Sequence, residues 1–126
     1  MSDFSFSKSE RLTNKKKFER LFKSGVVIKA YPLKLIYISE EKLSSQSSEP
    51  PFQFAFTVPK RNFKKAVDRN YLRRRMKEVF RLNKQQLLTK IDLEKYSVFG
   101  IFIYSMREKT DFHNIEKAFL KLIEKL

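Results

Sequence analysis

The chain has 126 residues, enough for one compact domain but hardly for two. Lysine and arginine number 28 against 14 acidic residues, and the net charge of +14 indicates a nucleic-acid partner ahead of an anionic membrane or a merely soluble basic protein. Cysteine is absent, which excludes a disulfide framework, a thiolate zinc site and a cysteine nucleophile.

The N-terminal segment is polar and lacks the apolar core of a secretory signal. No run of apolar residues in the chain reaches the length that spans a bilayer. We therefore expect a soluble cytoplasmic protein without a membrane partner. Residues 1–126 are predicted to form a single domain, in which residues 1–8 are a flexible N-terminal arm.

A first helix is expected directly after this arm. Thr13 or Asn14 can cap its N-terminus, because a side-chain oxygen there accepts a hydrogen bond from an amide that the helix leaves unpaired. Phe18 and Phe22 recur at helical spacing. Gly25 suits a residue in the left-handed conformation just past the end of the helix.

The middle of the chain predicts strands separated by a loop. Residues 26–39 are rich in β-prone side chains but contain Pro32, which predicts either one bent strand or two short ones. Residues 39–51 are rich in serine, glutamate and proline, which is typical of a solvent-exposed loop. Large apolar side chains alternate with smaller or polar ones in residues 52–58, which predicts a half-buried strand antiparallel to the preceding one.

The longest predicted helix covers residues 66–83, where apolar side chains repeat on one side. Residues 84–95 are expected to form a polar connection. Residues 96–104 are a near-continuous apolar run, which predicts a central strand covered on both faces. Asp111 can cap a last helix with an apolar stripe. Together these elements predict one α/β domain.

A dense group of basic residues follows the strand of residues 52–58. Its members are Lys60, Arg61, Lys64, Lys65, Arg69, Arg73, Arg74 and Lys77. Positions 65, 69 and 73 are four residues apart, so their side chains are predicted to line one helix face. Guanidinium groups match phosphate oxygens, and Asn70 can donate and accept towards a sugar or a base edge. Because acidic residues are too few here to neutralise the group, a nucleic-acid contact is favoured over a merely solvated face.

The order Ala66-Val67-Asp68-Arg69-Asn70, followed by Arg73-Arg74, resembles the signature of the bacterial ribonuclease P protein component. Upstream, SERLTNKKKFERLFKSG is similar to the first helix of that family and FAFTVPKR to the strand before the motif. The run YSVFGIFIYSMRE and the amphipathic C-terminal helix match as well, so the resemblance covers nearly the whole chain.

Two positions depart from the family pattern. Tyr71 stands where the family usually has an arginine, which puts one expected RNA contact in doubt; the ring is expected either to stack on a base or to pack. Lys64 stands where the family often has a glycine, which suggests a differently shaped connection within the same fold.

The resemblance implies both a fold and a function. The fold is an α+β two-layer sandwich, ribosomal-protein-like, of order αβββαβα, with a mixed sheet and a basic helix that carries the Arg-Asn motif. The function is that of the protein subunit of ribonuclease P, an endonuclease that removes the 5′ leader of precursor tRNA. By resemblance, the basic residues above and Asn70 bind the RNA subunit. One protein is expected per RNA, and the RNA subunit is expected to supply catalysis and to require Mg²⁺, with no cofactor bound by the protein alone.

The family holds the single-stranded leader in a central cleft, which by resemblance would include Arg11, Phe18, Phe22, Lys34 and Ile36. Single-stranded RNA commonly stacks its bases on aromatic side chains beside a basic groove. Aromatic residues at helical spacing are also the usual material of a hydrophobic core. The sequence leaves both roles open for Phe18 and Phe22.

The chain shows no active site of its own. It has one histidine, His113, and its acidic residues are scattered, so neither a histidine-based acid–base pair nor a carboxylate metal site is predicted. A ribosomal protein or a general RNA chaperone without a role in cleavage would share the size and charge. A DNA-binding protein is a weaker alternative, because a strand precedes the basic helix where a helix-turn-helix would have a helix.

Overall fold

The computed structural model describes residues 10–41 and 51–126. Within these ranges the chain forms three helices and four strands in the order αβββαβα. They are α1 (Lys15–Ser24), β1 (Val26–Ala30), β2 (Leu33–Glu41), β3 (Phe52–Thr57), α2 (Ala66–Thr89), β4 (Tyr96–Tyr104) and α3 (Phe112–Glu124). The predicted arm, residues 1–8, and residues 42–50 of the predicted loop lie outside the described residues.

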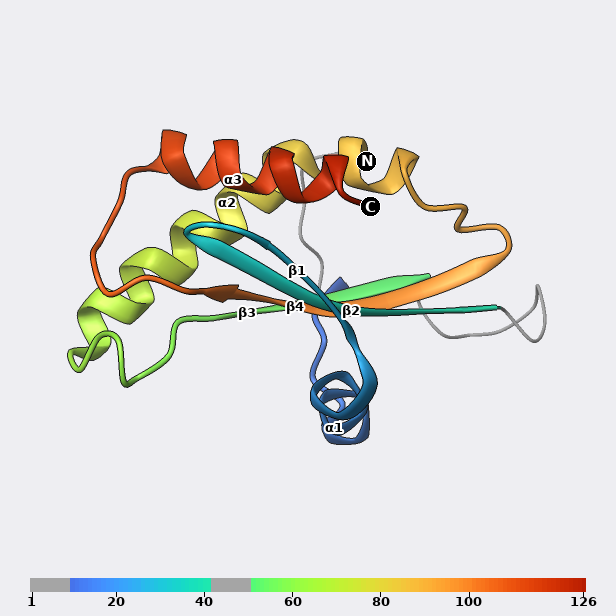
Figure 1. Cartoon of the computed structure of the whole chain (residues 1–126), viewed down its shortest axis with the longest axis horizontal. Coiled ribbons are helices and arrows are strands. Elements are labelled where there is room, and N and C mark those ends of the chain that lie inside the picture. The colour runs from blue at the N-terminus through green and yellow to red at the C-terminus, as the bar shows by residue number, and fades with distance from the viewer. Residues whose placement is uncertain (1–9, 42–50) are drawn as a thin grey trace.

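The strands form one mixed sheet with helices on both faces (Figure 1). The strand order is β1-β2-β4-β3, in which the first two pairs are antiparallel and β3 runs parallel to β4. α2 connects these two parallel strands and packs with α3 on one face, while α1 lies on the other. The predicted α+β class, element order and mixed sheet are confirmed, and α1 adds a partial third layer to the two that were expected.

The pairing of the strands differs from the prediction in two respects. β2 and β3 are not neighbours, because β4 lies between them and pairs with both. β4 is buried from Val98 to Tyr104, so its central position removes the most apolar strand from water. β2 also continues to Glu41, which pairs with Tyr96, so residues 39–41 belong to a strand and not to the predicted loop.

α2 continues to Thr89, well past its predicted end at residue 83. The additional turns contain polar side chains that tertiary contacts bury. Lys84 Nζ lies 3.1 Å from Glu10 Oε2, and Asn83 Nδ2 donates a hydrogen bond to Glu116 Oε2 at 2.9 Å. Buried polar groups need such partners. Because these partners come from distant parts of the chain, the local sequence pattern could not show that these polar residues belong to a buried helix.

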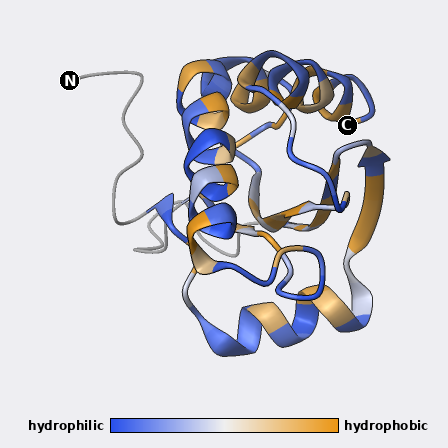
Figure 2. Ribbon diagram, turned by 90° about the vertical axis from the view of Figure 1, so that its left-hand side faces the viewer, coloured by the Kyte–Doolittle hydropathy of each residue, from blue (hydrophilic) through white to orange (hydrophobic). Residues whose placement is uncertain are grey.

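The main hydrophobic core lies between the sheet and the pair α2 and α3. Its centre is a group of aromatic rings whose centroids lie 5.3–6.1 Å apart in contacting pairs, formed by Phe54, Phe56, Phe80, Phe102 and Phe119. The helices carry both hydrophobic and hydrophilic residues, as expected when one side faces the sheet and the other faces water (Figure 2). Of the 11 phenylalanines within residues 10–41 and 51–126, eight are buried, so few of these remain for a binding surface.

Two of the predicted helix caps are confirmed. Asn14 Oδ1 accepts a hydrogen bond from Lys17 N at 3.2 Å, and Asp111 Oδ1 accepts one from Asn114 N at 2.9 Å. Of the two candidates for the first cap, Asn14 is therefore the one used. None of the helices in the described ranges combines the length and the apolar character that crossing a membrane requires.

The glycine after α1 serves a different purpose from the one predicted. Gly25 has φ −70° and ψ 150°, so the expected left-handed conformation is wrong. A Cβ at this position would lie 2.5 Å from both Ile36 Cγ2 and Leu21 O, which is too close for any side chain. The glycine thus lets the chain turn from α1 into β1 while pressed against β2. β1 and β2 then form a hairpin through a cis Tyr31-Pro32 bond, which agrees with the alternative of two strands, although β2 with nine residues is not short.

Candidate nucleic-acid interface

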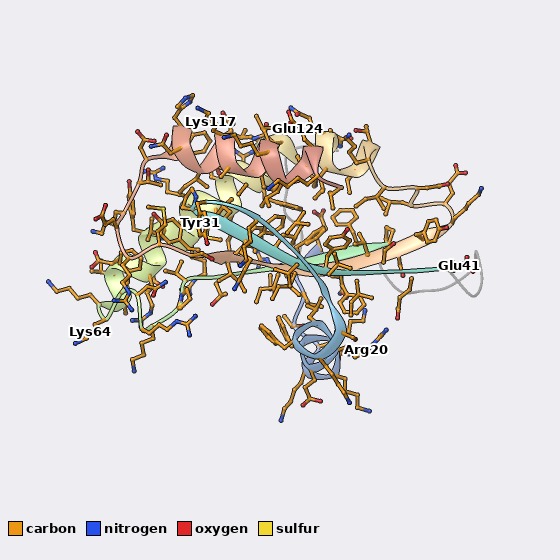
Figure 3. All side chains as sticks on the ribbon, viewed as in Figure 1. Arg20, Tyr31, Glu41, Lys64, Lys117 and Glu124 are labelled. Carbon is orange, nitrogen blue, oxygen red and sulfur yellow. The ribbon has the colours of Figure 1, made fainter. Side chains whose placement is uncertain are left out.

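The connection from β3 to α2 displays its basic side chains on a fixed turn. Asn62 N and Phe63 N donate to Pro59 O at 3.1 and 3.3 Å, and the buried Phe63 ring packs 5.8 Å from that of Tyr104. The basic residues on either side of this anchor are exposed: Lys60, Arg61, Lys64 and Lys65. Lys64 extends away from the body of the molecule (Figure 3).

Arg69 does not project from α2 in line with Lys65 and Arg73. Its Nη1 donates hydrogen bonds to Phe63 O and Lys64 O, both at 2.8 Å. The side chain thus ties the first turns of α2 to the connection that precedes the helix. This role is structural, and it was not apparent from the spacing of the residues.

Asn70 and Arg73 form a pair on the exposed side of α2. Asn70 Oδ1 accepts a hydrogen bond from Arg73 Nη2, which orients the guanidinium group one turn along the helix. Arg74 is exposed beside them. A guanidinium held in this way keeps donors on its other nitrogens that can meet a phosphate group.

Arg11 joins the basic surface of α2, which we define as Lys60, Arg61, Lys64, Lys65, Asn70, Arg73, Arg74, Lys77 and Arg11. It forms an isolated bridge with Phe54 at the edge of the sheet, where Leu12 N donates to Phe54 O at 2.9 Å. Burial, and then the positive charges of Arg73 and Arg11, hold the pKa of Lys77 below its usual value. Like charges gathered in this way favour an anionic partner, which relieves their repulsion.

The residues predicted for a cleft are divided between the surface and the core beneath α1. Phe22 is 63% exposed, whereas Phe18 is half-buried against the core under α1. Ile36 is only 7% exposed and belongs to the core under α1, so it presents little surface to a ligand. The two rings therefore differ, and Phe22 is the one free to meet a base.

Lys34 lines an open pocket of about 360 Å³ at the end of the sheet where β4 ends. Three segments meet there: the β1–β2 hairpin, the connection after β3 and the loop after β4. Its lining contains four cations and two exposed large hydrophobic side chains, namely Lys29, Lys34, Arg61, Arg107, Tyr31 and Met106. We call this set the cationic pocket. A phosphodiester chain with exposed bases suits it, because cations lie beside an exposed tyrosine.

Four members of the cationic pocket were not predicted as site residues. Lys29 lies near the end of β1, Tyr31 lies in the turn that follows, and Met106 and Arg107 follow the central strand β4. Their positions at strand ends were the available signal, since side chains at neighbouring strand ends converge when the sheet forms. Arg61 belongs to both the cationic pocket and the basic surface of α2, so the two cationic surfaces are continuous.

Acidic residues near α2 are engaged in ion pairs. Asp68 Oδ1 lies 2.5 Å from Lys109 Nζ, and Glu78 Oε1 lies 2.6 Å from Arg81 Nη2. The hydrogen bond from Arg81 lowers the pKa of Glu78. Across residues 10–41 and 51–126, no group of three or more histidine or acidic side chains is placed to hold a metal ion. The arrangement can bind and position an anion.

Comparison with known proteins agrees with this chemistry. The family model described as Ribonuclease P matches residues 6–126. A ribonuclease P protein component of Porphyromonas gingivalis is 30% identical over 118 residues, which cover 94% of this chain and 83% of the relative. One of Chlorobium phaeobacteroides is 38% identical over 102 residues, covering 79% and 67%.

Solved structures share the fold at lower identity. The ribonuclease P protein from Thermotoga maritima superposes with a TM-score of 0.65 at 22% identity, over 93% of this chain and 97% of that one. A Staphylococcus aureus ribonuclease P protein superposes with a TM-score of 0.63 at 18% identity, over 92% and 93%.

Proposed function

The chain belongs to the family of ribonuclease P protein components, and from this premise we propose that it is the protein subunit of a ribonuclease P ribonucleoprotein. In this role it binds the catalytic RNA and the 5′ leader of precursor tRNA and promotes 5′ maturation. The observation that carries the proposal is the continuity of two cationic surfaces, one on α2 and one in the cationic pocket, through Arg61. One protein acts per RNA, in the cytoplasm of a bacterium.

The basic surface of α2 supports a contact with the RNA subunit. Asn70 orients Arg73, and Arg74 lies exposed beside it. Arg11 and Lys77 add charge at the edge of the sheet. A set of cations spread along one helix suits the regular phosphates of a folded RNA, because each guanidinium can donate two parallel hydrogen bonds.

The cationic pocket and the exposed ring of Phe22 support a contact with the leader. Both lie on the sheet face that α1 covers only in part, so a single strand can follow that face. Base stacking on aromatic side chains tolerates different sequences, since every base has a flat face. A leader that differs between precursor tRNAs needs that tolerance.

The protein contributes charge and position, while the RNA subunit supplies the catalytic groups and needs Mg²⁺. Cations near the leader reduce repulsion between the two RNA chains, so the complex works at a lower Mg²⁺ concentration. Binding through phosphates releases counterions, and affinity should therefore fall steeply as salt rises. Flat affinity across a salt titration would contradict this part of the proposal.

The test is cleavage of a precursor tRNA by a bacterial ribonuclease P RNA at low Mg²⁺, with and without the protein. The variant Arg73→Ala/Arg74→Ala is preferable to a change at Arg69, because Arg69 also holds the connection. Lys117→Ala/Lys121→Ala on α3 removes the same charge from exposed positions elsewhere. We expect the unaltered protein and the α3 variant to restore 5′ cleavage and the α2 variant to lose it. Binding without any effect on cleavage would favour a ribosomal protein or an RNA chaperone.

A further inference from the structure

The second turn of α2 carries an exposed aromatic ring outside the two surfaces described above. Tyr71 is 41% exposed, and Arg75 Cζ and Lys109 Nζ lie 5.1 and 5.9 Å from the centroid of its ring. Val67, one turn earlier, is 69% exposed. Successive helix residues turn by about 100°, so these side chains lie on the flank of α2 next to the loop before α3, away from Lys77.

The surroundings of this ring are fixed by the fold. Lys109 Nζ pairs with Asp68 Oδ1 on α2 at 2.5 Å. The buried Tyr104 donates from its hydroxyl to Glu108 O at 2.6 Å, which ties down the loop just before Lys109. The cap of α3 holds its other end. An open pocket of about 410 Å³ results, lined by Tyr71, Lys109, Thr110 and Asp111.

The charge balance distinguishes this flank from the basic surface of α2. Asp68 is paired with Lys109, and Glu78 further along α2 is paired with Arg81. The charge of Lys109 is therefore offset and Arg75 is the remaining cation at the ring, whereas Lys77 has only cations among the charged neighbours that shift its pKa. The uncharged ring itself offers little to a phosphate group. It offers a flat face to a base.

We infer that Tyr71, with Arg75 and Lys109 over its ring, is a stacking site for one unpaired nucleobase of the RNA subunit. The inference rests on the proposed function, in which α2 binds that RNA. Tyr71 follows Asn70 directly and lies one turn before Arg74, so a strand bound there brings an adjacent nucleotide within reach. The guanidinium of Arg75 extends the platform, because arginine planes also stack on bases.

The position is one at which this chain departs from its family. An arginine there would meet a phosphate, whereas tyrosine carries no charge at neutral pH and presents a ring. The site therefore replaces a salt-sensitive contact with one that depends on stacking. This difference can be measured, because the two contacts respond differently to ionic strength.

The first experiment uses fluorescence. The chain contains no tryptophan, so Tyr71→Trp introduces a single indole reporter. We expect its emission to be quenched when the full-length protein is titrated with the ribonuclease P RNA of the same organism, in the absence of precursor tRNA. Tyr96→Trp is the matched control. It places an exposed indole at the start of β4, whereas the loop that contacts Tyr71 follows the end of that strand. Its emission should not change.

The second experiment measures affinity for the same RNA. Tyr71→Ala should weaken binding by about 5- to 150-fold, which corresponds to the loss of one stacked base. Tyr71→Phe should keep the affinity within about twofold, since the ring remains. The dependence of affinity on salt should be unchanged in Tyr71→Ala, because no phosphate contact is lost. Thermal unfolding should also be unchanged, since the side chain is exposed.

Three results would overturn the stacking site. They are normal affinity in Tyr71→Ala, an equal loss in the alanine and phenylalanine variants, and an indole at position 71 that only precursor tRNA quenches. If any of these occurs while the unaltered protein binds the RNA and stimulates cleavage, the proposed function stands without the site. If the unaltered protein does not bind the RNA subunit, both fall together.

Discussion

The two faces of the sheet differ in how fully they are covered. α2 buries seven residues and shares a large aromatic core with α3, whereas α1 buries only Leu21 on the opposite face. The cationic pocket and the exposed Phe22 ring lie on the thinly covered face. The face covered by α2 and α3 therefore carries most of the buried core, while the other face is left more open. Substitutions should therefore separate stability from binding.

The largest effect is expected in the aromatic core. Phe102→Ala removes a ring that packs against Phe54, Phe56 and Phe119, and should lower the free energy of unfolding by about 3–5 kcal/mol. Urea denaturation followed by circular dichroism measures it. A loss below about 1 kcal/mol would show that the core does not dominate folding.

The buried ion pair that joins residue 10 to α2 comes next. Lys84→Met leaves the carboxylate of Glu10 without its cation in a mostly buried place, and should cost about 3 kcal/mol. The double variant Lys84→Met/Glu10→Gln removes the charge left behind and should recover part of that loss. Urea midpoints of both variants test the pair, and equal stability of the two would contradict it.

A smaller loss is expected where α1 meets the sheet. Gly25→Ala places a Cβ against Ile36 and the carbonyl of Leu21, so α1 must shift, at a cost of about 1–3 kcal/mol. Lys23→Ala, at an exposed position near the end of the same helix, is the control and should be almost neutral. If both variants have the same melting temperature, the contact under α1 is looser than the structure indicates.

Alkaline pH probes the main core through Tyr104. Burial raises the pKa of its hydroxyl from 10.0 to about 12, so the unfolded chain releases this proton at lower pH than the folded one. The stability that results is complete below about pH 10 and is lost as the pH rises towards 12. Tyr104→Phe should lower the free energy of unfolding by about 1 kcal/mol at neutral pH. Above pH 10 the stability of this variant should decline less steeply than that of the unaltered protein. Parallel declines would argue against a buried hydroxyl.

The smallest effect on folding is expected at Phe22. Because its ring is exposed, Phe22→Ala should change the free energy of unfolding by less than about 0.5 kcal/mol. Under the proposed function it should weaken binding of precursor tRNA by about 5- to 150-fold, through the loss of one stacked base. Mature tRNA without a leader is the control. An equal loss for both RNAs would place the effect outside the leader.

The residues of the Arg-Asn motif and the connection before it were only partly predictable from their local sequence. The exposed positions of Lys64, Lys65 and Arg74 agree with the prediction of a basic surface. Arg69 was grouped with them by its spacing, but it also holds the carbonyls of the connection. Spacing along a helix gives the direction in which a side chain leaves the backbone. It does not show that a carbonyl five or six residues away will accept its hydrogen bond.

The position of Arg11 could not be predicted from its local sequence either. The resemblance placed it with the cleft residues near α1, whereas in the structure it lies close enough to Lys77 of α2 to lower the pKa of that lysine. Its bridge to Phe54 decides this, because that bridge carries the chain along the edge of β3 before α1 begins. The two residues are 43 positions apart (54 − 11), and nothing in either local pattern indicates that they meet.

The sequence by itself determined the α+β class, most of the elements, the N-terminal caps of α1 and α3, and the family. Periodicity, charge and motif order are local properties that can be read from the sequence without knowledge of the fold. Only the tertiary structure decided which strand is central, how far α2 extends, which ring of α1 is exposed and which cations share the cationic pocket. Each of these depends on contacts between distant segments, such as the ion pair of Glu10 with Lys84. Such contacts form, and stabilise the fold, only once the chain is compact.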